Sequence, residues 1–271
     1  MIVVRLIGGL GNQLFQFATA RALATLKNCE MALDVSGFQR YLLHRYSLHH
    51  FNISAQVVDE QVLAKLNGGY HYREVSLAFD KQVFSLPIPL YLEGYFQSED
   101  YFKDCRNQIL SELKVVSPLG PKNLTLVNFL ERVSETVSLH VRRGDYVSNP
   151  SANAVHGTCG ADYYRKACEY MLSKTRNPTF VVFSDDIAWA KENLEVPGNK
   201  VFVDWNDASA NFADLKLQQL CHHNIIANSS FSWWGAWLGC SSSKEVVAPK
   251  NWFQKGMHVG HSVLPERWVS F

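Results

Sequence analysis

The sequence predicts an α/β protein with two domains, each built around a sheet of parallel strands. The chain has 271 residues, which exceeds the usual size of a single domain. Short apolar runs alternate along it with stretches of helical periodicity, as in sheets whose parallel strands are joined by helices. Several of these runs end in glycine or polar residues, and such sheets bind ligands beyond the carboxyl ends of their strands.

The first domain is expected over residues 1–115. Helical periodicity starts at Asn12, directly after a glycine turn at residues 8–11, so a strand, a turn and a helix open the chain. Apolar runs predict three short strands in this domain, at residues 2–7, 31–34 and 88–92. Prolines and a glycine in residues 115–125 break every periodic pattern, which places the domain boundary there.

The second domain is expected over residues 125–250. Apolar runs predict five strands in it, at residues 137–141, 179–183, 201–203, 224–227 and 245–248. Four helices are predicted between them, at residues 161–174, 189–194, 214–221 and 232–238. This alternation indicates a doubly wound parallel sheet. Residues 251–271 are expected to form a tail that packs back on the body through Trp252, Phe253 and Trp268.

The composition disfavours several classes of function. A net charge of +1 offers no electrostatic footprint for nucleic acid. The six cysteines are scattered without a C-x-x-C pair, so neither a disulfide framework nor a zinc site is predicted. No secretion signal and no apolar run of membrane-spanning length is evident, and the expected location is the cytoplasm.

Four turns after predicted strands carry polar or glycine residues, at residues 8–13, 140–145, 184–186 and 228–232. The strongest chemical signal is the adjacent pair Arg142 and Arg143, whose guanidinium groups suit a diphosphate. Because neighbouring side chains diverge, we expect one arginine to face a ligand and Arg143 to pair with Asp145 or a backbone carbonyl. The alternative is that both are ordinary surface residues.

Small hydroxyl residues precede the predicted helix at residues 232–238. They either cap this helix or, with its free amides and positive dipole end, form a seat for phosphate. The following Trp233, Trp234 and Trp237 are expected to pack rather than to bind sugar.

The first glycine turn contains a G-x-G pair, Gly9 and Gly11, but Leu14 occupies the third glycine position of the dinucleotide fingerprint. This disfavours an NAD-dependent oxidoreductase, and a P-loop spacing is also absent from the sequence. The glycines either let the backbone approach a ligand or merely turn the chain.

Carboxylates at residues 184–186 and 204–207 invite a metal interpretation, but neither segment has an Asp-x-Asp spacing. Asp185 is expected to cap the following helix or to accept hydrogen bonds from a base or ribose. The histidine pairs at residues 49–50 and 222–223 are adjacent, so their side chains diverge. We therefore expect no metal site.

The segments HVRRGD, FSDD and NSSFSWWGAWL, in this order, together with GGLGNQLFQ and LEGYFQS, resemble the α-1,2-fucosyltransferases of glycosyltransferase family 11. They come from both halves of the chain. The resemblance implies a GT-B-type fold, in which two Rossmann-like domains face each other across a cleft. It also implies that the first domain binds the acceptor and the second GDP-fucose. Fucose would move to the 2-hydroxyl of galactose with inversion and without a metal.

The resemblance also implies roles for individual residues. Arg142 would contact the donor diphosphate, and Ser229 and Ser230 would approach its phosphates. The guanine pocket would lie near His140, Asp185 and the segment that begins at His222. The other residues expected on the donor side are Gly9, Gly11, Asn12, Asn228 and Phe231.

A carboxylate should accept the proton of the acceptor hydroxyl, and Asp34, Glu93 and Asp145 remain open as candidates.

A catalytically inactive carbohydrate- or GDP-binding protein with the same fold is the alternative function. A galactose-containing acceptor could be an O-antigen repeat linked to lipid, which would bring the protein to the inner membrane face as a peripheral protein.

Overall fold

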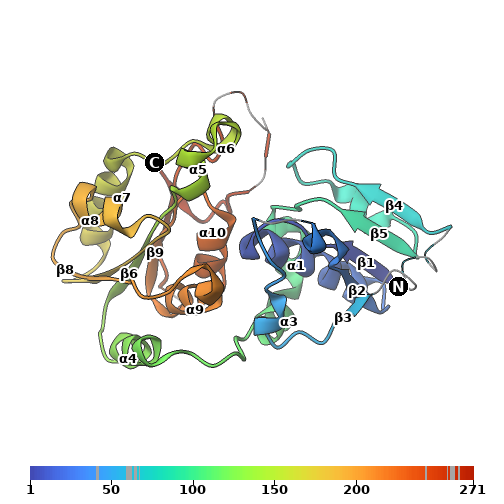
Figure 1. The fold of residues 1–271 in the computed structure, drawn as a ribbon, viewed down its shortest axis with the longest axis horizontal. Helices are drawn as coiled ribbons and strands as arrows, with labels where there is room; N and C mark the ends of the chain where they lie inside the picture. The colour runs from blue at the N-terminus through green and yellow to red at the C-terminus, as the bar shows by residue number, and fades with distance from the viewer. Residues whose placement is uncertain are drawn as a thin grey trace. The chain divides into compact units, whose positions relative to one another are not determined.

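The computed structural model describes residues 1–40, 43–58, 63, 66, 68–241, 243–254, 256, 260–261 and 263–271. The chain divides into two compact units. Unit 1 comprises Met1–Ser117 and His258–Pro265, and unit 2 comprises Pro118–Met257 and Glu266–Phe271. Each unit contains one sheet of parallel strands with helices packed on it, which confirms the predicted α/β, GT-B-type fold class (Figure 1).

Unit 1 has a five-stranded sheet in the order β3-β2-β1-β5-β4. Its strands are β1 (Ile2–Arg5), β2 (Met31–Asp34), β3 (Gln56–Val58), β4 (Tyr70–Arg73) and β5 (Leu90–Glu93). The sequence pattern did not predict β3 and β4, because both are edge strands with mostly exposed side chains and so lack a continuous apolar run.

Unit 1 includes helices α1 (Leu10–Leu26) and α3 (Arg106–Glu112), with 3-10 turns at Ser36–Gln39, Leu48–His50, Lys81–Ser85, Glu99–Tyr101 and Lys103–Cys105. Helix α1 packs against β1 and β2. It starts two residues before the predicted start, because Gly8 turns the chain with a φ of 78° and Gly9 is the N-cap. The predicted turn residue Gly11 therefore lies inside the first helical turn.

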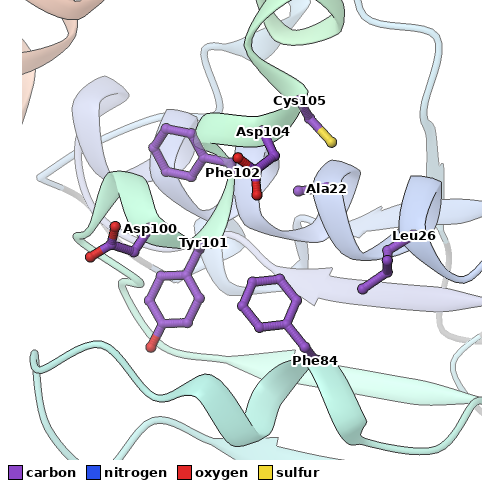
Figure 2. A pocket seen from close by; sticks show the side chains of 8 residues that line it. All are labelled: Ala22, Leu26, Phe84, Asp100, Tyr101, Phe102, Asp104 and Cys105. Carbon is purple, nitrogen blue, oxygen red and sulfur yellow. The ribbon is translucent and has the colours of Figure 1, made fainter.

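Unit 1 has a pocket with a volume of about 250 Å³. Side chains of α1 and of the segment around Tyr101 line it, with Phe84 on one side (Figure 2). None of the predicted site residues lines this pocket.

Unit 2 has a six-stranded sheet in the order β11-β10-β9-β6-β7-β8. Its strands are β6 (Thr136–Val141), β7 (Thr179–Ser184), β8 (Asn199–Phe202), β9 (His223–Ile225), β10 (Val246–Ala248) and β11 (Val269–Ser270). Its helices are α4 (Pro121–Leu130), α5 (Gly144–Ser148), α6 (Pro150–His156), α7 (Ala161–Lys174), α8 (Ile187–Asn193), α9 (Asn211–Leu220) and α10 (Ser230–Trp237), with a 3-10 turn at Ala208–Ala210.

The core of unit 2 has two layers, one on each face of the sheet. Along β7, Phe180 and Val182 pack with α7 and α8, whereas Val181 and Phe183 pack with α4 and α9. Alternate side chains of a strand point to opposite faces, so both faces of β7 are buried under helices. This is the doubly wound arrangement predicted for residues 125–250.

Several elements of unit 2 differ from the predicted pattern. Helix α4 begins at Pro121, inside the expected linker, because proline is well tolerated at the first helical position. The short helices α5 and α6 follow β6, and Asn149 caps α6 by accepting from the amides of Ser151 and Ala152. Strand β8 begins at Asn199, two residues before the predicted strand.

The last residues of the chain, Glu266–Phe271, belong to unit 2. Strand β11 pairs with β10, and the ring of Trp268 lies 5.3 Å from that of Trp233. Trp252 and Phe253 are buried.

Across the described part of the chain, no helix combines the length and apolar character needed to cross a bilayer. All six cysteines are free thiols.

Candidate functional site

Three of the predicted turns lie together at one edge of the unit 2 sheet. Strands β9, β6 and β7 are neighbours and run parallel, so their carboxyl ends meet at this edge. The residues that follow these strands are Asn228, Arg142 and Asp185. The tertiary structure thus assembles three turns into one site. They are the arginine turn (residues 140–145), the aspartate turn (residues 184–186) and the serine turn (residues 228–232).

Arg142 is held by two carboxylates. Its Nη2 lies 2.5 Å from Asp145 Oδ1 and its Nη1 lies 2.7 Å from Asp185 Oδ2. The side chains of Arg142 and Asp185 are about three-quarters buried. An ion pair with this limited exposure is screened less than one on the open surface. The guanidinium is therefore fixed in place, and each terminal nitrogen has a second N–H besides the one that faces a carboxylate.

Arg143 has different partners from those predicted. Its Nε lies 3.2 Å from Asp186 Oδ2, and its guanidinium lies 3.9 Å from the ring centre of Trp189. The prediction that it pairs with Asp145 is wrong, because Asp145, in the first turn of α5, pairs with Arg142 instead. Arg143 thus ties the arginine turn to α8.

Asp185 closes the arginine turn. Besides binding Arg142, its Oδ1 accepts a hydrogen bond of 2.8 Å from the backbone amide of Arg143. Its Oδ2 lies so close to Gly144 that a Cβ there would be 2.5 Å away. The predicted capping role falls instead to Asp186, which accepts from the amide of Trp189.

The serine turn leads into α10 without a side-chain cap. Ser229 is the N-cap residue, but its hydroxyl makes no capping hydrogen bond, so capping does not explain the serines. The first amides of any helix lack partners within the helix and carry the positive end of its dipole. Ser230 and Phe231 occupy this first turn and are half-exposed. This helix start can accept an anion.

The tryptophans of α10 serve packing, as predicted. Trp233, Trp234 and Trp237 are each at most 2% exposed, and their rings contact one another at 5.1–6.0 Å between centroids. A Cβ at Gly235 would lie 2.6 Å from the Gln218 side chain of α9. Small size at this position lets α9 and α10 approach closely.

Asn228 connects backbone segments. Its Nδ2 donates to the carbonyls of His156, Gly157 and Trp252 at 2.9–3.3 Å, and its Oδ1 accepts from the thiol of Cys159. An amide nitrogen has two hydrogens, so these acceptors leave it no donor for a ligand. Asn228 therefore shapes the serine turn from behind.

His140 is neutral at physiological pH. It is 5% exposed, and burial together with the nearby Arg142 lowers the pKa of its imidazole to about 3. Its ring lies 5.6 Å from that of Phe231, and within the described residues its Nδ1 has no hydrogen-bond partner. A neutral imidazole beside Arg142 adds no charge to the site.

His222 does not lie near this edge. It follows α9 and precedes β9, and its Nδ1 lies 2.9 Å from the hydroxyl of Thr136, the first residue of β6. Parallel strands rise about 3.3 Å per residue, so the length of β6 separates His222 from Arg142. The prediction that His222 borders a pocket with His140 and Asp185 is wrong.

The glycine motif of unit 1 is braced by glutamines. Gln13 donates to the carbonyls of Gly8 and Arg45, and Gln16 donates to the carbonyl of Gly94. The side chain of Asn12 packs over Gly8 and accepts from Gln97. These contacts explain the polar residues of the motif as supports for the loops around it.

Two of the three candidate bases belong to a polar cluster in unit 1. Asp34 is 2% exposed and accepts from Tyr91 Oη at 2.5 Å and from a backbone amide. Glu93 is more accessible and lies 3.2 Å from Arg5 and 3.3 Å from His71. The third candidate, Asp145, is the carboxylate bound to Arg142 in unit 2.

Comparison with known families fits this geometry. The profile described as "Glycosyl transferase family 11" matches residues 1–271. This chain belongs to that family. The glycine, arginine, aspartate and serine turns described above are thus parts of a family 11 glycosyltransferase.

Known relatives of this family 11 chain include glycosyltransferases of bacteria and mammals. An α-1,2-colitosyltransferase of Escherichia coli is 33% identical, with 99% of this chain and 98% of that protein covered. The E. coli O-antigen biosynthesis glycosyltransferase WbnK is 31% identical, with 92% and 93% covered. Galactoside α-(1,2)-fucosyltransferase 2 of Oryctolagus cuniculus is 26% identical, with 99% and 76% covered.

Solved fucosyltransferases share the fold of this family 11 chain. Arabidopsis thaliana FUT1 in complex with GDP gives a TM-score of 0.56 at 12% identity, covering 93% of this chain and 71% of that one. Fucosyltransferase NodZ from Bradyrhizobium gives 0.53 at 14% identity, covering 88% and 93%. At this identity the similarity establishes the architecture.

Two carboxylates of this family 11 chain were missed by sequence reasoning. Burial raises the pKa of Glu74, which accepts from the amides of Tyr95 and Phe96. Burial also raises the pKa of Asp214 to about 6, and its Oδ1 accepts from Asn206 at 2.6 Å. No motif contains them, so only their burial distinguishes them.

Within the described residues, no three His, Cys, Asp or Glu side chains are placed to hold a metal ion.

Proposed function

We propose that this family 11 glycosyltransferase is a galactoside α-1,2-fucosyltransferase that uses GDP-fucose. The observation that carries the proposal is the placement of Arg142 beside the uncapped start of α10, at adjacent strand ends of one sheet. A guanidinium and free helix amides are a binding site for a diphosphate. The names of the relatives support α-1,2 transfer of fucose or of a closely related sugar.

The proposed reaction makes use of this placement. The 2-hydroxyl of galactose attacks the anomeric carbon of fucose while the bond from that carbon to the phosphate oxygen breaks. The bonding electrons leave with GDP, and Arg142 and the amides of α10 stabilise the negative charge that develops there. The hydroxyl proton passes to a carboxylate, for which Glu93 and Asp145 are the accessible candidates. A single displacement of this kind inverts the anomeric configuration.

We further propose that transfer needs no divalent cation. The charge of Arg142 and the dipole of α10 would provide the stabilisation that a metal ion supplies in other transferases. The test is the release of GDP from GDP-fucose with lactose as the acceptor, measured in the presence of EDTA. We expect undiminished turnover, and strict dependence on added Mn²⁺ would contradict this part of the proposal.

The acceptor is proposed to be a galactose-terminated glycan, such as an O-antigen repeat. A panel of galactose-terminated glycans, free and lipid-linked, would identify it. Preference for the lipid-linked forms would support peripheral contact with the inner membrane face. Equal use of glucose- and galactose-terminated acceptors would contradict the acceptor assignment.

A second candidate is transfer of colitose, because one bacterial relative is named for that sugar. Colitose is fucose without its 3-hydroxyl. Competition between the two GDP-sugars for one enzyme preparation separates the candidates. A larger kcat/KM for GDP-colitose than for GDP-fucose would identify colitose as the transferred sugar.

The remaining alternative is a protein that binds GDP or glycan without turnover. Calorimetry with GDP and with lactose, on the same preparation that is assayed for transfer, separates these functions. Binding without product after prolonged incubation with GDP-fucose and the acceptor panel would favour the binding protein.

A further inference from the structure

An aromatic column runs from Arg142 into the body of unit 2. The guanidinium of Arg142 lies 5.3 Å from the ring centre of Tyr146, in α5. The Tyr146 ring is stacked on that of His156, the last residue of α6, at 4.6 Å and an interplanar angle of 6°. His156 in turn lies 5.5 Å from the ring of Phe253. The column therefore links Arg142 to the C-terminal segment.

Backbone hydrogen bonds and close packing hold the far end of this column. The amide of Gln254 donates to the carbonyl of Val155 at 2.8 Å. Gly157 has a φ of 62°, and a Cβ there would lie 2.1 Å from Nε2 of the Gln254 side chain. Residues 252–254 are thus fastened to the end of α6, with Phe253 only 6% exposed.

Asn228 fastens the same segment to the serine turn. Its side chain donates to the carbonyls of Trp252 and His156, and its own carbonyl accepts from the hydroxyl of Tyr146 at 3.3 Å. The arginine turn, the serine turn and the C-terminal segment are therefore parts of one connected network.

We propose that Phe253 is a positioning residue for Arg142 and acts through the stacked rings of His156 and Tyr146. The inference rests on the proposed function, because it assigns Arg142 the donor diphosphate. Asp145 and Asp185 fix the ends of the guanidinium, whereas the column supports its face. Support on the face keeps the guanidinium at one distance from the start of α10 before the donor binds.

The column should affect the binding of the donor diphosphate and not the binding of the guanine base. A pre-positioned guanidinium loses less freedom on binding, and a cation over an aromatic ring is attracted to the electrons of the ring face. Replacing Phe253 with methionine keeps much of the volume and removes the last ring. We expect Phe253→Met to weaken GDP binding about tenfold, while the affinity for guanosine stays unchanged.

Calorimetry on the full chain tests this expectation with GDP and guanosine as probes. Phe253→Tyr keeps the ring and should retain the wild-type affinity for GDP. Phe180→Met removes a buried ring from the core layer under α7 and α8, and is the matched control for lost packing. Equal losses for Phe180→Met and Phe253→Met, or equal losses for GDP and guanosine, would overturn the inference.

A double-mutant cycle shows whether the effect passes through Arg142. In the Arg142→Ala background, Phe253→Met should not weaken GDP binding further. A full additional tenfold loss would mean that Phe253 acts elsewhere. If Phe253→Met does not fold, His156→Asn interrupts the same column in its middle and is tested in the same way.

A signal in the unliganded protein separates this inference from the proposed function. The Nε–Hε resonance of Arg142, assigned with Arg142→Lys, should shift in Phe253→Met and not in Phe180→Met. An unshifted resonance would refute the positioning role even if the enzyme transfers fucose. If the wild-type protein neither binds GDP nor transfers sugar, but the Arg142 resonance still shifts in Phe253→Met, the proposed function is refuted. The positioning role of Phe253 then stands.

Discussion

Arg142 Nη1 lies 2.7 Å from Asp185 Oδ2, although the two residues follow different strands of the unit 2 sheet. The same carboxylate accepts from the backbone amide of Arg143. Asp185 therefore fixes both the main chain of the arginine turn and the direction of the guanidinium. Changes to this arrangement should alter activity more than stability.

Arg142→Ala should reduce turnover by several powers of ten and leave the fold intact. The variant loses a charge-assisted contact that strengthens as negative charge develops on the leaving GDP. Steady-state GDP release measures the loss, and circular dichroism checks the fold. Wild-type turnover in this variant would contradict the role assigned to Arg142.

Gly144→Ala should disturb the same arginine turn. The new Cβ would lie 2.5 Å from Asp185 Oδ2, so the carboxylate must move and release Arg142. We expect kcat/KM to fall at least tenfold. Gly160→Ala is the control, because a Cβ at Gly160 meets nothing within 4 Å. Similar activity of the two variants would show that the position of Asp185 is not critical.

Asp145→Asn should tighten the binding of GDP several-fold at low salt. The Asp145 carboxylate lies 2.5 Å from Arg142 and competes with a diphosphate for the guanidinium. The gain should shrink as salt rises, because Asp145 is 39% exposed and its charge is screened. Calorimetry at two salt concentrations measures both effects, with the exposed Asp162→Asn as the control. Weaker binding would indicate that the orientation of Arg142 by Asp145 matters more for GDP than the competition between the two anions.

Glu93→Gln should lower kcat by about 10²–10⁴, the usual contribution of a general base. Asp34→Asn should change kcat less, because Asp34 is 2% exposed and Tyr91 and a backbone amide occupy its oxygens. The affinity for GDP should be unchanged in both variants. A larger loss in Asp34→Asn than in Glu93→Gln would favour Asp34 over Glu93 as the base.

Asp214→Asn should stabilise the protein at neutral pH. Burial raises the pKa of Asp214 from 3.8 to about 6, so the folded state binds this proton more tightly than the unfolded state. The free energy of unfolding must then fall as the pH rises from about 4 to 6, and the penalty persists above that range. The variant should be more stable by about 3 kcal/mol at pH 7.5 and nearly equal to wild type near pH 3.5.

Urea denaturation of Asp214→Asn and wild type at these pH values tests the prediction. Asp162→Asn is the control, since the Asp162 side chain is 90% exposed. An equal difference at both pH values would mean that burial of the Asp214 charge is not the cause.

The central strands of both sheets could be predicted because they are buried on both faces. Such strands are continuous apolar runs, as in β6 and β7, and the turns that follow them are visible in the sequence. Strand β4 and helix α5 could not be predicted. The former is a mostly exposed edge strand, and the latter is a five-residue helix stabilised by contacts around Arg142 and Tyr146.

The order and residue types of the polar turns were evident from the chain alone, because each turn is a local feature that follows an apolar run. The side-chain partners of the residues in those turns were not evident from the chain alone. Asp145 binds Arg142 and Asp186 binds Arg143, and His222 lies at the far end of the strands from both arginines. Sequence separation does not determine which side chains meet when neighbouring residues point in opposite directions. Strand order and register, which are set by packing of the whole unit, determine those pairings.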